Sequence, residues 1–128
     1  MTRDLIALRL NKNPNFDTSA LQTTQIYTYQ LSQQNKVLAF TRGSNNDLVV
    51  LMNLSSVVYS NGYIIGAPAA GTWNIAFNSD LKKYSSSFGD MGSGVSSITS
   101  QPNSYGGFSN SINVPLGAYS CVILVRSS

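Results

Sequence analysis

The sequence of 128 residues contains no histidine, and its five acidic residues are all aspartate, so glutamate is absent as well. General acid–base catalysis near neutral pH relies most often on histidine or on a glutamate with a shifted pKa. A nucleophile triad that includes histidine cannot be built from these residues. Two catalytic aspartates would need a defined short separation, whereas these aspartates are dispersed along the chain. We therefore expect that this chain alone is not an enzyme.

Cysteine is almost absent too. The single Cys121 lies in the apolar stretch YSCVILV, which favours a buried small hydrophobic residue over a disulfide. Without histidine or glutamate, a metal site would need aspartate ligands alone. We expect no metal site and no cofactor.

Charge is sparse: 10% of the residues are charged, and the net charge of +3 comes from scattered lysine and arginine. A nucleic-acid binder needs a clustered basic stripe, and the only basic doublet is Lys82-Lys83. Apolar runs of about five residues are too short to cross a bilayer, and MTRDLIALRL lacks the features of a signal peptide. We expect neither nucleic acid nor a membrane as a partner. The weakly charged surface suits polyhydroxylated ligands or an extracellular setting, and the compartment stays open.

One segment, Thr2 to Asn11, has the pattern of a helix. Thr2 suits the N-cap, and Pro14 prevents the helix from continuing. Apolar residues recur at three- and four-residue spacing and predict a single stripe: Leu5, Ile6, Leu8 and Leu10. So short a helix is not stable alone. We expect it to pack on the strands that follow or on a body outside this chain.

After about residue 25 the sequence changes to short apolar runs between turn residues, which is typical of β-strands. Strands are expected in these stretches: QIYTYQL, KVLAFTRG, DLVVLMNLS, VVYSNGYIIG, GTWNIAFNSD, SINVP and YSCVILVR. The near-continuous apolar run DLVVLMNLS indicates a central strand covered on both faces. Asn61-Gly62 predicts a hairpin turn.

The stretch GTWNIAFNSD has the clearest alternation in the chain. Trp73, Ile75 and Phe77 are expected on one face, and Asn78 to Asp80 are expected to end the strand in a turn. From Asp80 to Asn110 no periodicity is visible, which predicts a long Ser/Gly-rich loop. Short strands without crossover helices predict an all-β fold: an antiparallel two-sheet Greek-key sandwich with one short N-terminal helix.

Five stretches occur in a fixed order along the chain: RDLIALRLNKNP, KVLAFTRG, DLVVLMNLS, GTWNIAFNSDLKKYSSSFGD and YGGFSNSINVPLGAYSCVILV. Together they resemble the C-terminal part of α-amylase-family enzymes, which include amylases and glucan branching enzymes. The resemblance implies that residues 1–24 are the remnant of the last helix of a catalytic (β/α) barrel with its linker. It also implies that residues 25–128 form a C-terminal β-sandwich domain.

The catalytic Asp, Glu and Asp of that family lie on loops of a barrel that this chain does not contain. The resemblance therefore implies a non-catalytic accessory domain of an enzyme that acts on α-glucans such as starch or glycogen. Its expected partner is the catalytic barrel, on which it packs and which it stabilises. A remote glucan-contact surface is also implied, and the parent protein is expected to be a glycoside hydrolase or a branching enzyme.

Three aromatic residues are candidate carbohydrate contacts: Trp73, Tyr84 and Tyr105. Trp73 could stack on a pyranose ring, but its place in an alternating apolar pattern favours the core. Tyr84, Tyr105 and the neighbouring Phe88 fall in the long loop region, where they would contact a sugar or pack the loop on the sandwich.

Two other functions stay open. An autonomous carbohydrate-binding module or lectin-like domain would bind starch or maltooligosaccharides without a barrel. A structural surface or adhesion protein is compatible with the low charge and the many serine and asparagine residues. Asn53-Leu54-Ser55 matches the N-glycosylation sequon, but it is expected to end a central strand, so we do not expect it to carry a glycan.

Overall fold

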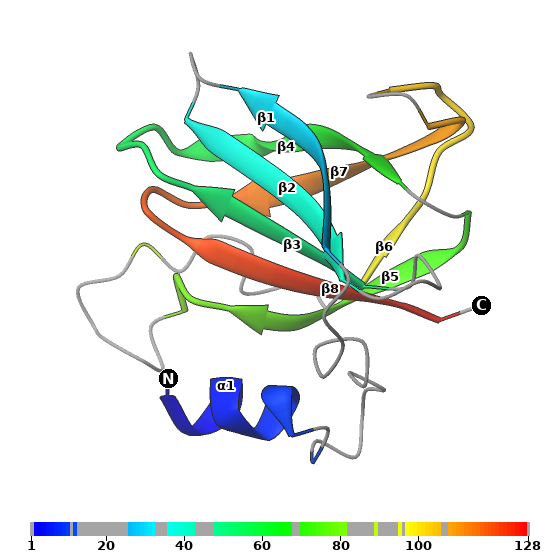
Figure 1. Cartoon of the computed structure of the whole chain (residues 1–128). Helices are drawn as coiled ribbons and strands as arrows, with labels where there is room; N and C mark the ends of the chain where they lie inside the picture. Colours follow the sequence, from blue (N-terminus) through cyan, green and yellow to red (C-terminus); the bar gives the residue numbers. More distant parts are fainter. Residues whose placement is uncertain are drawn as a thin grey trace.

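The computed structural model describes residues 2–10, 12, 26–32, 36–42, 48–67, 70–81, 89, 95, 97–105 and 108–127. In this part of the chain there are one helix and eight strands (Figure 1). Their bounds are α1 Thr2–Arg9, β1 Ile26–Ser32, β2 Val37–Arg42, β3 Leu48–Asn53, β4 Tyr59–Ala67, β5 Thr72–Asn78, β6 Ser97–Thr99, β7 Asn110–Leu116 and β8 Cys121–Ser127.

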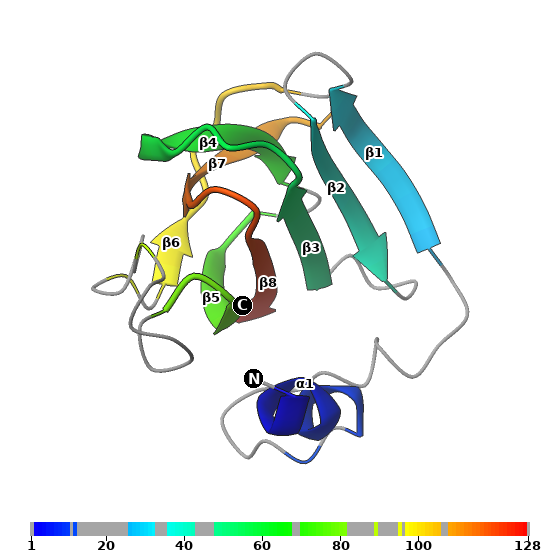
Figure 2. The same cartoon turned by 90° about the vertical axis from the view of Figure 1, so that its left-hand side faces the viewer.

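The strands form two antiparallel sheets, one of six strands in the order β1-β2-β3-β8-β5-β6 and one of two strands, β4-β7. The small sheet lies over one face of the large sheet, and α1 lies beyond the other face (Figure 2). The last strand, β8, pairs between β3 and β5, so the C-terminal segment closes the centre of the large sheet. The predicted two-sheet sandwich with one short N-terminal helix is confirmed.

Both faces of the six-stranded sheet carry buried apolar side chains. The inner cluster, between the two sheets, contains Val37, Ala39, Val49, Leu51, Ile65, Ala67, Trp73, Ile112, Val114, Leu116, Val122 and Leu124. The outer cluster, on the side of α1, contains Leu8, Leu48, Val50, Phe77, Ile123 and Val125. Because side chains alternate along a strand, β3 contributes to both clusters. The prediction that β3 is a central strand covered on both faces is confirmed.

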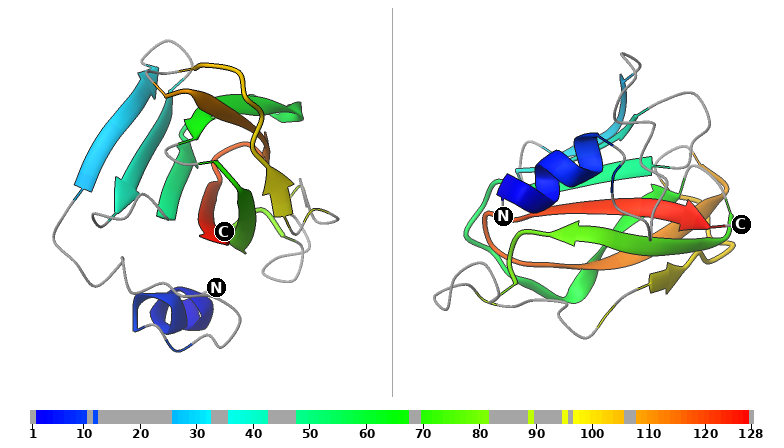
Figure 3. Two further views of the ribbon diagram at one scale, coloured as in Figure 1. Left: turned by 90° about the vertical axis from the view of Figure 1, so that its right-hand side faces the viewer. Right: turned by 90° about the horizontal axis from the view of Figure 1, so that it is seen from below.

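Helix α1 lies across the outer face of the large sheet (Figure 3, right). Leu8 is 1% exposed and packs in the outer cluster, whereas Ile6 and Leu10 are 53% and 50% exposed. At roughly 100° per residue, Ile6 and Leu10 project roughly 160° away from Leu8. The predicted single stripe is therefore wrong. The helix turns one leucine toward the sheet and two large apolar residues away from it.

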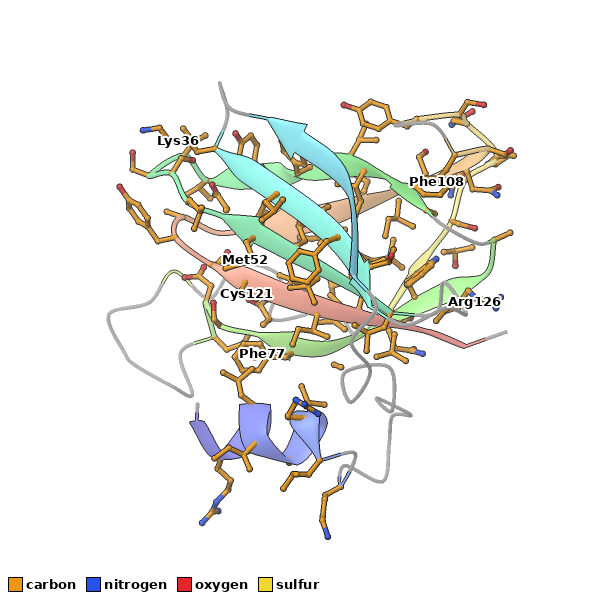
Figure 4. All side chains as sticks on the ribbon, viewed as in Figure 1. Lys36, Met52, Phe77, Phe108, Cys121 and Arg126 are labelled. Carbon is orange, nitrogen blue, oxygen red and sulfur yellow. The ribbon has the colours of Figure 1, made fainter. Side chains whose placement is uncertain are left out.

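The expected common face of Trp73, Ile75 and Phe77 is also wrong. Trp73 and Ile75 pack in the inner cluster, and Phe77 packs in the outer one, on the side of the sheet that faces α1 (Figure 4). The register between β5 and β8 shifts between Ile75 and Phe77, which pair with the adjacent residues Leu124 and Ile123. The extra residue Ala76 forms a β-bulge, and the bulge reverses the alternation of the side chains.

The hairpin expected at Asn61-Gly62 is not formed, because β4 runs through this site as one strand. Gly62 has a φ of 94° at a register shift between β4 and β7. A Cβ atom at this position would meet the side chain of Asn113. Glycine therefore permits a bulge with positive φ and a close neighbour. The Asn-Gly pair that predicted a turn lies inside a strand instead.

Candidate functional site

Trp73 is fully buried between the two sheets, with 0% of its surface exposed. A buried indole offers no face to a sugar ring. The interpretation of Trp73 as a core residue is confirmed. The interpretation of Trp73 as a carbohydrate contact is wrong.

Tyr84 and Phe88 lie outside the described residues. Tyr105 is described and is 45% exposed. It belongs to the segment between β6 and β7, which the sequence predicted as loop. β6 itself is a short strand within the predicted loop, paired with β5 from Thr72 to Asn74.

Four backbone hydrogen bonds fix the segment around Tyr105, which we name the arm (residues 101–105 and 108–111). Gln101 and Ser111 exchange two N–H···O bonds of 2.8 and 2.9 Å. Tyr105 and Phe108 exchange two more, of 3.0 and 3.1 Å. The arm is thus a hairpin-like segment, and the backbone of Tyr105 is held in place by hydrogen bonds.

The arm lies directly against β4 at Gly66. A Cβ atom at Gly66 would lie 2.5 Å from the carbonyl oxygen of Tyr105 and 2.8 Å from the Phe108 ring. Such contacts are too close for any residue with a side chain, so Gly66 permits the approach. Sequence reasoning missed this role because a glycine at the end of a strand usually indicates a turn.

The outer face of the β4–β7 sheet is open beside the arm. Ile64 is 48% exposed there, and the exposed Asn113 pairs with it on β7. The side chain of Asn113 folds over Gly62. No residue of β4, of β7 or of the segment 101–111 is charged.

A second exposed aromatic residue, Tyr119, lies in the β7–β8 turn. It is 71% exposed, has a φ of 49°, and its N–H donates to the carbonyl of Ser55 over 3.0 Å. Exposed aliphatic residues of the β3–β4 connection lie in the segment bonded to this turn: Leu54, Val57 and Val58. The stretch YSCVILVR predicted a strand that includes Tyr119, because Tyr119 comes just before an apolar run, but β8 begins only at Cys121 and this part of the prediction is wrong.

Asn53 joins these two connections. Its buried side-chain amide donates hydrogen bonds of 2.8 Å to the carbonyls of Val57 and Gly117. Its Oδ1 accepts from the N–H of Ser55 at 3.0 Å and from the Ser55 hydroxyl at 2.7 Å. The amide nitrogen that a glycan would modify is therefore occupied and inaccessible in the folded chain.

Asp80 has a structural role at the end of β5. Its N–H donates to Asn78 Oδ1 over 3.0 Å, which confirms the predicted turn. The carboxylate is almost buried, accepts from the N–H of Gly89 at 3.0 Å, and lies against Gly117.

Burial raises the pKa of the Cys121 thiol from 9.0 to about 11, so this thiol is a poor nucleophile at neutral pH.

Among the described residues, no group of three or more His, Cys, Asp or Glu side chains could hold a metal ion. In the same part of the chain, no helix is long and apolar enough to cross a membrane.

The family described as "Alpha amylase, C-terminal all-beta domain" matches residues 27–127. A "1,4-alpha-glucan branching enzyme GlgB 1" of Xanthomonas euvesicatoria pv. vesicatoria is 39% identical over 90 residues, which cover 66% of this chain and 12% of that enzyme. The enzyme of the same name from Xanthomonas campestris pv. campestris is 33% identical over 93 residues, covering 70% and 12%. The chain therefore spans only a small fraction of these relatives.

Proposed function

The chain belongs to the family of α-amylase C-terminal all-β domains, and from that premise we propose that it is the accessory domain of an enzyme acting on α-glucans. In this proposal, residues 25–128 form the accessory sandwich, and residues 1–24 are the last barrel helix and its linker. The sandwich packs on the catalytic barrel through α1 and stabilises it. The two similar enzymes are branching enzymes by name, which supports a glucan-active parent.

The two-sided packing of α1 carries this proposal. Leu8 is buried against the sheet, while Ile6 and Leu10 project from the opposite side with half of their surface in water. A helix of 8 residues is not stable by itself, and exposed large apolar residues on it indicate a further contact. Burial of the exposed half of both side chains would contribute about 2 kcal/mol. If α1 lies between the sandwich and a barrel, the side with Leu8 packs on the sandwich and the side with Ile6 and Leu10 packs on the barrel.

The chain alone should release no reducing sugar from soluble starch and should form no branches in amylose. The purified chain can be assayed beside a preparation without protein. Activity above that background that copurifies with the chain would refute the non-catalytic assignment.

Packing on a barrel can be tested by fusing the chain to the catalytic barrel of the Xanthomonas euvesicatoria enzyme, in place of that enzyme's own C-terminal segment. We expect the fusion to melt at a higher temperature than the barrel alone. The double variant Ile6→Ser/Leu10→Ser should lose this gain. Ile64→Ser is the matched control, because Ile64 is similarly exposed but lies on the opposite side of the sandwich.

A glucan-contact surface is the second part of the proposal. Tyr84 and Tyr105 remain its candidates. Tyr105 has direct support, because its ring is exposed on a hydrogen-bonded arm. An autonomous carbohydrate-binding module would use the same surface. The two functions differ in the fusion experiment, since only the accessory domain raises the stability of a barrel.

A further inference from the structure

The side of the sandwich that faces away from α1 is formed by the β4–β7 sheet (Figure 2). Phe108, at the end of the arm, lies on that side, whereas Phe77 lies next to α1 (Figure 4). If α1 faces the barrel, as in the proposed function, the outer face of β4–β7 points away from the barrel (Figure 2). A ligand can reach this face without displacing the barrel.

Three kinds of surface follow one another along β4. The Asn113 amide lies over Gly62, the Ile64 side chain comes next, and the arm with Tyr105 and Phe108 covers Gly66. From position 62 to position 66 the strand extends roughly 13 Å. The surface is therefore long enough for more than one sugar ring.

The chemistry of this face suits a neutral polyhydroxylated chain. A pyranose ring has an apolar C–H side, which packs on aromatic and aliphatic groups, and hydroxyls, which need polar partners. Tyr105 and Ile64 offer the first kind of contact, and the Asn113 amide and the exposed Gln101 offer the second. Ligand sites commonly combine apolar area with a few positioned polar groups. The absence of charge in these segments disfavours an ionic ligand.

The arm is also fixed before any ligand binds. The two bonds between Tyr105 and Phe108 and the two between Gln101 and Ser111 hold its backbone, and the contact with Gly66 seats it on the sheet. A tyrosine on a fixed base loses little conformational freedom on binding, because only two side-chain torsions remain.

We propose that the outer face of the β4–β7 sheet, together with the arm, is a binding site for an α-1,4-linked glucan chain. Tyr105 stacks on a sugar ring, Ile64 contacts the next part of the glucan, and Asn113 forms hydrogen bonds with the hydroxyls of the glucan. Gly66 is a positioning residue, because its lack of a side chain lets the backbone of Tyr105 lie close to β4. The choice of an α-glucan rests on the proposed function, whereas the location rests on the geometry of the arm.

Binding of maltoheptaose to the 128-residue chain, measured by isothermal titration calorimetry, tests the site. Tyr105→Ala should weaken binding about tenfold or more, as expected for an aromatic anchor, while Tyr105→Phe should bind nearly as well as the unchanged chain. Tyr119→Ala is the matched control, because Tyr119 is even more exposed but lies in the β7–β8 turn. The melting temperature of each variant separates loss of binding from loss of fold.

Several outcomes would overturn the proposal. These are no binding by the unchanged chain, equal binding by Tyr105→Ala, or loss of binding in Tyr119→Ala instead. Sedimentation velocity provides a further check, since self-association that Tyr105→Ala abolishes would assign the face to a second copy of the chain. The fusion experiment is independent, because Tyr105→Ala should not alter barrel stability. Failure of glucan binding with an intact gain in barrel stability would remove only this site, and the reverse result would remove only the packing role.

Discussion

Replacement of Asn53 by alanine would remove the side chain that ties the β3–β4 connection to the β7–β8 turn. The four hydrogen bonds of this side chain range from 2.7 to 3.0 Å, and the residue is fully buried. A hydrogen bond contributes about 1 kcal/mol net to stability, and more is lost where a buried partner is left without a bond. Gly117 keeps one partner, because its carbonyl also accepts from the Ser120 hydroxyl at 2.8 Å. We therefore expect Asn53→Ala to lower the free energy of unfolding by about 3 kcal/mol.

Asn53→Asp should be at least as destabilising as the alanine variant, although it is nearly isosteric. A carboxylate oxygen would replace the amide group that donates to the carbonyls of Val57 and Gly117, and a buried charge would face two acceptors. Urea denaturation followed by circular dichroism measures both variants. Asn103→Ala is the matched control, because Asn103 is exposed. A loss below about 1 kcal/mol for Asn53→Ala, or one no larger than that of the control, would refute the reasoning.

Three further predictions concern the two cores and the thiol. Leu8→Ala should lower the free energy of unfolding by about 2–3 kcal/mol, since Leu8 is fully buried in the outer cluster; an unchanged urea midpoint would show that α1 does not pack there. The fluorescence of Trp73, the only tryptophan, should resist quenching by iodide and should not change with maltoheptaose, because the indole is buried in the inner cluster; strong quenching in the folded chain would contradict this. Cys121 has a folded-state pKa of about 11 against 9.0 for an ordinary thiol, so the unfolded chain releases this proton first and the thiol's contribution to stability falls as the pH rises from 9 to 11. Iodoacetamide at pH 8 should accordingly modify the folded chain more slowly than the chain in urea, because the partly buried Cys121 has the higher pKa in the folded chain, and equal rates would contradict this.

The sequence predicted most strands because their signals are local. β3 is the clearest case, since its near-continuous apolar run reflects burial on both faces. The bulges could not be predicted, because an extra residue such as Ala76 looks like any other step in an alternating pattern. Asn61-Gly62 gave a correct local signal for positive φ at Gly62 but the wrong structure, since pairing with β7 decides between a turn and a bulge.

The candidate site was predicted only in part, for a related reason. Tyr105 could be predicted as a candidate, because an aromatic residue in a polar loop segment has no obvious core to join. The contact of Gly66 with the arm joins residues distant in the sequence, and no local pattern indicates it. The two-sided use of α1 also depends on context, because its apolar residues alone do not show which of them faces the sheet.

In the proposed function, this sandwich stabilises a catalytic barrel through the side of α1 that faces away from the sheet. The melting temperature of the barrel fusion is the decisive measurement. The fusion should melt above the isolated barrel, Ile6→Ser/Leu10→Ser should remove the increase, and Ile64→Ser should preserve it. An increase that survives the double variant, or no increase with the unchanged chain, would contradict it.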